Sequence, residues 1–143
     1  MKRVLFVCTG NFYRSRFAEA VFNFTAEKRG MVWRAFSRGL AIHIAPEGPL
    51  SEDAIRGLAE RGICQDHTAP CKAPATEADF AGASVIVAMH ELEHRPLLHE
   101  KFPAWEDRTR YWHVPDVHDM DPGAAMRLMD DNVRALADEL AVS

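Results

Sequence analysis

A cysteine, an arginine and a serine lie close together in the stretch VLFVCTGNFYRSR, residues 4–16. Cys8 ends a run of apolar residues, and Arg14 and Ser15 follow it after a short turn. A thiol near a helix N-terminus and a cation loses its proton readily, and the thiolate is the nucleophilic form. The guanidinium of Arg14 can hold two oxygens of a tetrahedral oxyanion, and the Ser15 hydroxyl can donate to the sulfur. The pattern predicts a nucleophile and an anion clamp within one loop.

The residues between Cys8 and Arg14 add backbone donors to this loop. Successive N–H groups before a helix can converge on an anion, which requires left-handed backbone angles that glycine and asparagine tolerate. The thiolate would attack phosphorus while these donors hold the equatorial oxygens, where charge is spread. The alternative is that Cys8 is only a small buried apolar residue, as free cysteines often are. The predicted oxyanion-binding residues are Thr9, Gly10, Asn11, Phe12, Tyr13 and Ser15.

Two predicted elements flank the loop and would position it. The apolar run RVLFVC at 3–8 is typical of a strand buried on both faces of a parallel sheet. From Ser15 the apolar residues recur at helical spacing, and Gly30 supplies a stop for that helix. Glu19 and Glu27 are expected on the outer face of the helix. The cysteine would therefore stand at the carboxyl end of the first strand.

The rest of the chain alternates between strand and helix patterns. Ser51, Thr76 and Asp121 suit helix N-caps, whereas Pro96 could either break or start a helix. The predicted elements are strands at 32–37, 84–89 and 109–114, helices at 51–61, from Thr76 and from Pro122, and a long loop at 37–49.

This alternation predicts an α/β three-layer sandwich, with a four-stranded parallel sheet and helices on both faces, in a single domain at 1–143. Ligands of such sheets bind beyond the carboxyl ends of the strands. Asp116 follows the predicted strand at 109–114, so it should open onto the same edge as Cys8.

The stretch VLFVCTGNFYRSRFAEAVF resembles the signature of low-molecular-weight protein tyrosine phosphatases, which carry Cys-x5-Arg-Ser near the N-terminus. The resemblance extends over essentially the whole chain. WRAFSRG, TEADFAGASVIVAMHE and VPDVHD stand where the family has its second strand, its helix with the third strand, and its general acid. The resemblance implies the parallel sheet predicted above and phosphomonoester hydrolysis, with phosphotyrosine as substrate, without a metal or other cofactor.

The resemblance also implies roles for particular residues. Cys8 would be the nucleophile, Arg14 the phosphate clamp and Asp116 the general acid. The implied supporting roles are those of Asn11, which would hold the strained loop backbone, Ser15, which would bond the thiolate, and Ser37, which would brace Asn11.

The chain departs from the family pattern at several positions. Tyr13 stands where many members have a second cysteine that can protect the nucleophile. Val117 and His118 follow the acid where the family usually has proline and then aromatic residues that flank a substrate ring. Residues that could replace them in the pocket wall are Phe12, Tyr13, His43 and Trp112, with His118 as a further pocket contact.

The choice of general acid rests on position. Asp116 lies nearest the end of the predicted strand, and Asp119 is the alternative. Asp121 precedes Pro122 and a helical pattern, so it is interpreted as a helix cap.

Two further functions have to be weighed against the phosphatase. Cys64 and Cys71 resemble the relay cysteines of thioredoxin-coupled arsenate reductases, but they precede the third strand instead of following it. Unrelated connector cysteines are therefore favoured. A non-catalytic module that binds an oxyanion is the other alternative. The seven histidines match no zinc spacing well.

Composition limits the classes of function that remain. The net charge is −4 and no basic run is present, so the sequence does not indicate binding to nucleic acid or to a membrane surface. Three cysteines without a secretion signal favour a reducing cytoplasm over a disulfide framework. The expected protein is a cytoplasmic phosphatase that takes a phosphorylated protein or a small phosphoester and releases inorganic phosphate.

Overall fold

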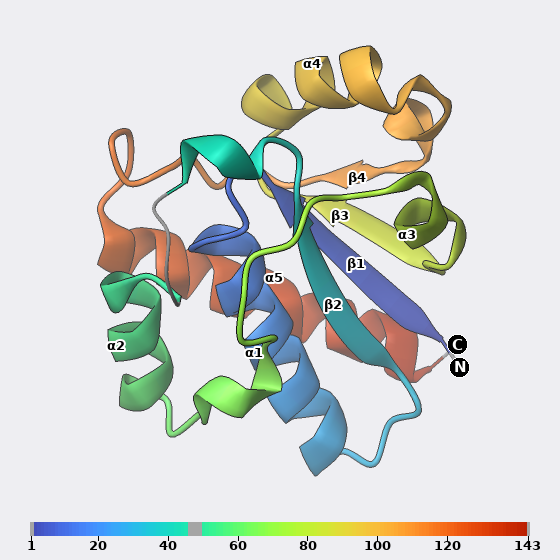
Figure 1. The fold of residues 1–143 in the computed structure, drawn as a ribbon. Coiled ribbons are helices and arrows are strands. Elements are labelled where there is room, and N and C mark those ends of the chain that lie inside the picture. The colour runs from blue at the N-terminus through green and yellow to red at the C-terminus, as the bar shows by residue number, and fades with distance from the viewer. Residues whose placement is uncertain (1, 46–49, 143) are drawn as a thin grey trace.

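Four parallel strands form one sheet in the computed structural model, which describes residues 2–45 and 50–142 (Figure 1). The order across the sheet is β2-β1-β3-β4, so the first strand of the chain is central. All four carboxyl ends therefore point to one edge, as predicted. The strands are β1 (Arg3–Cys8), β2 (Arg34–Gly39), β3 (Val85–Ala88) and β4 (Arg110–Tyr111).

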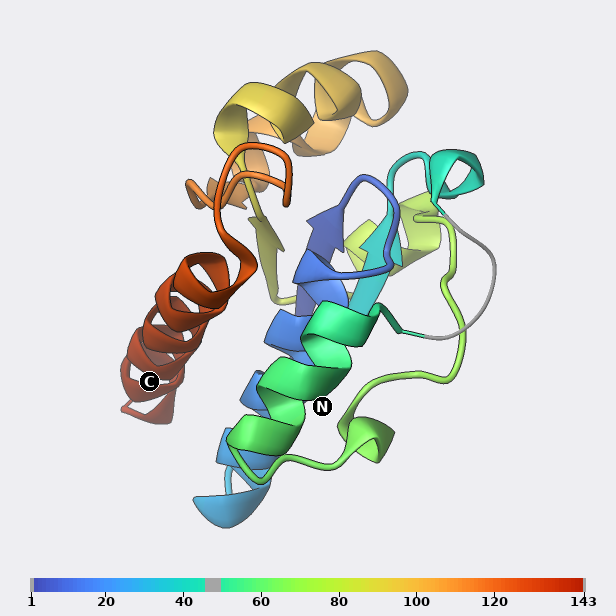
Figure 2. The ribbon, with the colours of Figure 1, turned by 90° about the vertical axis from the view of Figure 1, so that its left-hand side faces the viewer.

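Helices cover both faces of the sheet, as Figures 1 and 2 show from two sides. Buried side chains of α1, α2 and α5 form one apolar cluster with one face of the strands, and α3 and α4 contribute to the cluster on the other face. This arrangement confirms the predicted fold class. The helices are α1 (Arg14–Lys28), α2 (Glu52–Glu60), α3 (Glu77–Ala81), α4 (Glu91–Lys101) and α5 (Pro122–Ala141), and short 3-10 turns are η1 (Ile42–Ile44), η2 (Gln65–His67) and η3 (Pro103–Arg108).

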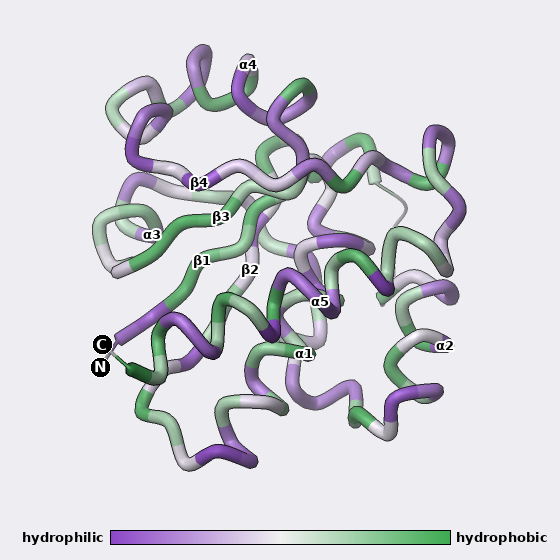
Figure 3. Tube along the Cα trace, turned by 180° about the vertical axis from the view of Figure 1, so that it is seen from behind, coloured by the Kyte–Doolittle hydropathy of each residue, from purple (hydrophilic) through white to green (hydrophobic). Residues whose placement is uncertain are grey.

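The central strand is buried on both of its faces because its side chains alternate between the two clusters. Val4, Phe6 and Cys8 belong to the cluster of α1 and α5, whereas Leu5 and Val7 belong to that of α3 and α4. Figure 3 shows β1 and β3 as apolar over most of their length and α4 as mainly hydrophilic. The predicted burial of the first strand is confirmed.

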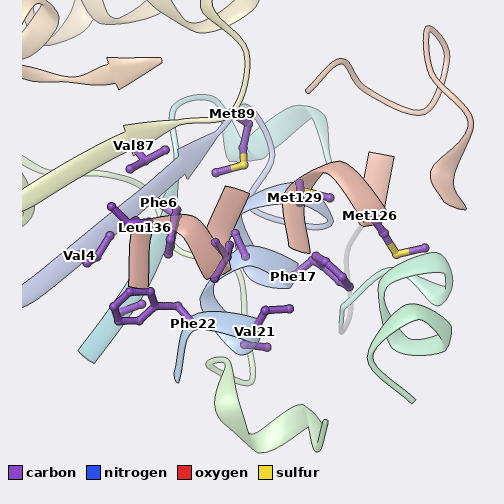
Figure 4. Packing of buried hydrophobic residues seen from close by; sticks show 14 of the residues in the cluster. Val4, Phe6, Phe17, Val21, Phe22, Val87, Met89, Met126, Met129 and Leu136 are labelled. Carbon is purple, nitrogen blue, oxygen red and sulfur yellow. The ribbon is translucent and has the colours of Figure 1, made fainter. Parts of the chain in front are cut away.

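The core beneath the loop from Cys8 to Arg14 is a contact between α1 and α5 against the sheet (Figure 4). Phe17 and Phe22 of α1 are fully buried, and Met129 of α5 is buried with them. The face of α5 that is turned to the core is buried at Met126, Met129, Val133, Leu136 and Leu140. This packing anchors the helix that begins at Arg14 and so holds the loop in front of it.

The three predicted caps are confirmed. Ser51 accepts a hydrogen bond from the Ala54 N–H at 3.2 Å, and Asp121 accepts one from the Ala124 N–H at 3.1 Å. Thr76 forms a complete capping box with Asp79. Each cap satisfies N–H groups that the first turn of a helix leaves unpaired.

Strand boundaries differ from the prediction where a neighbouring strand decides them. The second strand was expected at 32–37, but it spans 34–39 because it pairs residue for residue with β1. The fourth strand was expected at 109–114, but only 110–111 form regular strand. The Val114 N–H still donates to the Met89 carbonyl at 2.8 Å, so the chain follows β3 beyond β4.

Two other predictions concern proline and the long loop. Pro96 neither starts nor breaks a helix, because it lies inside α4. The carbonyl that it leaves without a helical partner belongs to the exposed Leu92, where water can bind it. The predicted loop at 37–49 is partly replaced by β2 and η1, and residues 46–49 lie outside the described residues.

Candidate active site

The stretch from Cys8 to Arg14 forms a loop at the carboxyl edge of the sheet, between the end of β1 and the start of α1. Figure 2 shows this loop between η1 and the segment that precedes α5. Asn11 has a φ of 53°, and it is the only non-glycine residue with positive φ among residues 2–45 and 50–142. Asparagine tolerates this left-handed conformation better than most residues.

Gly10 is needed for space and not for a left-handed angle. A Cβ atom at this position would lie 2.7 Å from the Ala45 Cβ. Of Gly10 and Asn11, only Asn11 therefore has the predicted left-handed backbone. Glycine at position 10 lets the residue after η1 approach the loop closely.

The side chain of Asn11 connects the loop to two other segments. Its Nδ2 donates to the Ser15 Oγ at 2.9 Å and to the Ser37 Oγ at 3.0 Å. Its Oδ1 accepts from the Ala73 N–H at 2.9 Å. These bonds hold the strained residue in place, and they include the predicted contact between Ser37 and Asn11.

Cys8 and Ser15 are in direct contact. The Cys8 Sγ lies 3.0 Å from the Ser15 Oγ, and both side chains are buried. Because the Ser15 Oγ already accepts from Asn11, its own hydrogen is available to the sulfur. The Ser15 hydroxyl is therefore positioned to donate to the Cys8 sulfur.

The guanidinium of Arg14 is buried and held by several acceptors. Its Nη1 donates to the Glu93 Oε1 at 2.9 Å and to the Val114 carbonyl at 3.0 Å, and its Nη2 donates to the Glu93 Oε2 at 2.7 Å. Burial alone would lower the pKa of Arg14, but the hydrogen bonds and charge of Glu93 raise it on balance. Arg14 therefore stays charged.

The donors of Arg14 that remain form a matched pair. A guanidinium has five N–H groups in one rigid plane. The three contacts above use both N–H groups of Nη1 and one of the two on Nη2. The Nε–H and the second Nη2–H remain, and they are parallel neighbours on the other edge. This edge has the spacing to bind two oxygens of a phosphoryl group.

Glu93 is the residue that fixes Arg14, and the sequence analysis did not identify it. Its Oε2 also accepts from the Thr9 hydroxyl and lies 3.2 Å from the His94 Nε2. Because the His94 Nδ1 accepts from the His90 N–H at 3.0 Å, its Nε2 carries the proton. Burial raises the pKa of Glu93, but the bonds from His94 and Arg14 lower it well below its usual range. Glu93 is therefore a carboxylate at neutral pH.

Glu19 is a second residue that the sequence analysis misplaced. It was expected on the outer face of its helix, but it is buried and accepts from the Ser37 Oγ at 2.6 Å and the Thr68 Oγ1 at 2.9 Å. It therefore anchors the serine that holds Asn11. The available signal was its position one helical turn after Ser15, which puts both on the loop-facing side.

Asp116 lies beside Arg14 in the segment between β4 and α5. Its Oδ2 is 3.7 Å from the Arg14 Nη2, its Oδ1 accepts from the Val117 N–H at 2.8 Å, and its side chain is 46% exposed. The carboxylate is thus both near the Arg14 guanidinium and open to water. Asp119, the alternative acid, is exposed and does not line the cavity that contains Arg14.

A cavity of about 380 Å³ opens over the loop. Its wall differs from the prediction in two positions, because neither His43 nor Trp112 contributes; Trp112 packs on Phe6 at 5.7 Å between ring centroids. The predicted contact of His118 is present. The lining residues are Cys8, Thr9, Gly10, Phe12, Tyr13, Arg14, Ile44, Ala45, Ser51, Asp53, Glu93, Asp116, Val117 and His118.

The other candidate groups do not line this cavity. Cys64 and Cys71 are exposed free thiols and do not line it. Within the described residues no group of three or more His, Cys, Asp or Glu could hold a metal ion. Nor does any helix in the described part of the chain have the length and apolar character to cross a membrane.

The sequence matches the family described as low molecular weight phosphotyrosine protein phosphatase over residues 3–141. The chain belongs to this family. The resemblance stated from the sequence is thereby confirmed, and membership makes the protein a phosphatase of the cysteine-dependent type.

Individual relatives agree with this membership. A protein-arginine-phosphatase of Bacillus subtilis is 31% identical over 106 residues, which are 74% of this chain and 67% of that protein. The structure of a low molecular weight protein tyrosine phosphatase from T. tengcongensis has a TM-score of 0.77 and 31% identity, covering 99% of this chain and 98% of the other. YfkJ from Bacillus subtilis, at 24% identity, shares the fold with a TM-score of 0.85, over 99% and 95% of the two chains.

Proposed function

We propose that this phosphatase hydrolyses phosphomonoesters in the cytoplasm through a phosphocysteine intermediate, with Cys8 as nucleophile, Arg14 as phosphate clamp and Asp116 as general acid. The observation that carries the proposal is the shared cavity at the carboxyl edge of the sheet. Cys8 and Arg14 come from one loop, and Asp116 reaches the same cavity from the segment before α5. Nucleophile, clamp and acid are the three groups that the reaction needs.

The reaction proceeds in two displacements. The Cys8 thiolate attacks phosphorus and forms an S–P bond while the bond to the leaving oxygen breaks, and Asp116 gives its proton to that oxygen. The Asp116 carboxylate then takes a proton from water, whose oxygen attacks phosphorus and releases the thiolate and inorganic phosphate. The free edge of Arg14 and the loop N–H groups stabilise the equatorial oxygens in both steps.

Phosphotyrosine is the substrate that the cavity wall favours. The apolar side chains of Phe12, Ile44 and Val117 line the cavity, and its volume of about 380 Å³ is sufficient for a phenyl ring. The Tyr13 ring joins this wall, with its hydroxyl 3.5 Å from the Pro122 carbonyl. An aromatic leaving group gains from such apolar contacts, whereas a charged one does not.

Phosphoarginine is the second candidate, and one relative supports it. The curated relative at 31% identity is named a protein-arginine-phosphatase. Asp53 and Asp116 both line the cavity, and their carboxylates could pair with a guanidinium. Comparing kcat/KM for a phosphotyrosine peptide and a phosphoarginine peptide of the same flanking sequence separates the two. We expect the phosphotyrosine peptide to be preferred, and a reversed order would assign the enzyme to arginine.

The catalytic proposal is tested by hydrolysis of p-nitrophenyl phosphate, with a chelator present, by the wild type and Cys8→Ser. The wild type should turn over and Cys8→Ser should not, although it should still bind phosphate through Arg14 and the loop. Hydrolysis near the wild-type rate in Cys8→Ser would refute the proposal. Phosphate binding by the wild type without hydrolysis would instead support the oxyanion-binding module.

The arsenate reductase alternative has its own test. It requires electrons to pass from reduced thioredoxin through Cys64 and Cys71 to Cys8, yet these two thiols do not line the cavity. Arsenate should therefore cause no oxidation of reduced thioredoxin by this protein. Arsenate-dependent oxidation that is lost in Cys64→Ser would revive the alternative.

A further inference from the structure

One wall of the cavity that contains Cys8 is formed by η1 and the residue after it. Ile44 and Ala45 line this cavity, and Ile44 is 65% exposed, so its side chain is open to a bound ligand. Both side chains are apolar and cannot hold the phosphoryl group, which Arg14 and the loop N–H groups would bind. The contacts available to this wall are therefore with the organic group that carries the phosphate.

Backbone hydrogen bonds among the described residues attach only the start of this segment to the loop from Cys8 to Arg14. The Leu40 N–H donates to the Cys8 carbonyl at 2.9 Å, and the N–H of the next residue donates to the Thr9 carbonyl at 2.8 Å. The Ile44 N–H and the N–H after it bond to carbonyls of the turn itself, at 3.3 and 3.1 Å. The part of the segment that lines the cavity is therefore attached in another way.

Lys72 provides this attachment from the connector between η2 and α3. Its Nζ donates to the Ile42 carbonyl at 2.8 Å and to the Ala45 carbonyl at 3.1 Å. Ile42 is the first residue of η1 and Ala45 directly follows the last, so one ammonium group spans the whole turn. Hydrogen bonds from a charged donor are stronger than those between neutral groups.

The connector that carries Lys72 is itself fixed to the sheet edge and to the loop. It runs past β2 toward α3 (Figure 1). The Ala73 N–H donates to the Asn11 Oδ1 at 2.9 Å, and the Ala73 carbonyl accepts from the Gly39 N–H at 2.9 Å. The Ala75 N–H donates in turn to the Gly39 carbonyl at 2.9 Å. Lys72 therefore holds η1 in a fixed place relative to the residue that shapes the loop of the nucleophile.

We propose that Lys72 is a positioning residue for substrate specificity, which holds Ile44 and Ala45 where they contact the aromatic group of a phosphorylated substrate. Lys72 does not line the cavity, so it acts through η1 and not on the substrate itself. The inference rests on the proposed function, because that function brings an aromatic group to this wall. Since Arg14 and the loop N–H groups would bind the phosphoryl oxygens, Lys72 should affect binding of the aromatic group and not binding of phosphate.

Two anions separate these effects when their dissociation constants are measured by calorimetry on the full chain. Benzylphosphonate carries an aromatic group and resists hydrolysis, whereas inorganic phosphate has no group that can reach the wall. Lys72→Met should weaken benzylphosphonate binding at least about threefold, because part of the apolar contact with the ring is lost. Phosphate binding should stay unchanged, and Lys72→Arg, which keeps a charged donor, should recover most of the loss. With phenyl phosphate as substrate, Lys72→Met should raise KM and leave kcat unchanged, since the wall contacts the ring equally in the ground state and the transition state.

Lys101→Met is the matched control. The Lys101 Nζ donates to the Leu40 carbonyl at 2.6 Å, so this is a second lysine that bonds the backbone of the same segment. Leu40 precedes η1 and also bonds to the Cys8 carbonyl, so the wall should keep its place without the lysine. Both anions should bind Lys101→Met as they bind the wild type.

A double-mutant cycle tests whether Lys72 acts through Ile44. Ile44→Ser should weaken benzylphosphonate binding by itself, and adding Lys72→Met should then cost less than it does in the wild type, because the two changes remove the same contact. The inference would be overturned by unchanged benzylphosphonate affinity in Lys72→Met, by an equal loss for phosphate, or by losses that add fully in the double variant. If the expected binding pattern is found in a wild type that does not hydrolyse phenyl phosphate, the inference is supported and only the catalytic proposal fails.

Discussion

Replacing Glu93 with glutamine tests whether this residue positions the phosphate clamp. Glu93 gives Arg14 two charge-assisted hydrogen bonds, at 2.9 and 2.7 Å. Glutamine keeps one acceptor and turns an N–H2 group toward the guanidinium, so one bond is lost and replaced by repulsion. A hydrogen bond to a charged group contributes about 1.5–3 kcal/mol. If the loss falls on the transition state, kcat/KM should decrease about 10- to 150-fold.

The assay is steady-state hydrolysis of p-nitrophenyl phosphate, with the inhibition constant of inorganic phosphate measured beside it. Both kcat/KM and phosphate affinity should weaken in Glu93→Gln, and Glu93→Asp should recover part of the loss because it keeps the charge. Glu91→Gln is the matched control on the same helix, since Glu91 pairs with the half-buried Arg95 at 2.9 Å, away from Arg14. A salt bridge near the surface contributes little to stability, and this pair makes no contact with Arg14.

Two results would refute this reasoning. If Glu93→Gln has the same kcat/KM as Glu91→Gln, the orientation of Arg14 does not depend on Glu93. If Glu93→Gln binds phosphate more tightly than the wild type, Glu93 competes with the substrate for Arg14 and does not position it. Thermal unfolding of each variant checks that the comparison is between folded proteins.

Three further predictions concern the clamp, the acid and the tyrosine beside them. Arg14→Lys should lose at least ~10²-fold in kcat/KM, because lysine cannot offer two parallel donors; activity within a few-fold of the wild type would mean that only charge matters. Asp116→Asn should slow hydrolysis of phenyl phosphate far more than that of p-nitrophenyl phosphate, by ~10²–10⁴-fold, since only the poorer leaving group needs its proton. Asp119→Asn should show no such dependence, and the reverse pattern would exchange the two assignments. Burial, and then Asp53, raise the pKa of Tyr13 to about 12. In the unfolded chain the Tyr13 hydroxyl ionises near pH 10, so the free energy of unfolding should fall between pH 10 and about 12. Denaturant titrations of Tyr13→Phe should not show this fall.

Local features of the sequence were sufficient to predict the loop from Cys8 to Arg14 and the elements next to it. Cys8 and Arg14 lie on one turn between a strand and a helix, and their arrangement follows from short-range geometry. The caps at Ser51 and Asp121 are equally local, because each depends on residues within one helical turn. The all-apolar first strand indicated a central position in a parallel sheet, since only such a strand is buried on both faces.

Contacts between distant residues were not predictable in the same way. Glu93 is 79 positions from Arg14, and nothing in its own helix marks it as the partner of a buried cation. Glu19 has the charge of a surface residue, yet hydroxyl groups from two other segments satisfy it in the interior. The limits of β2 depend on its register with β1 and not on its own apolar residues: Val32, inside the predicted range, is 71% exposed. Each of these follows from tertiary packing.

The most direct test of the central claim is to trap the covalent intermediate. The wild type is mixed rapidly with p-nitrophenyl phosphate, quenched in acid during turnover, and digested for mass spectrometry. The mechanism predicts one phosphoryl group on the peptide that contains Cys8, in an amount that rises in Asp116→Asn because the water step loses its base. A phosphoryl group on any other residue, or turnover without a phosphorylated Cys8 peptide, would contradict Cys8 as the nucleophile.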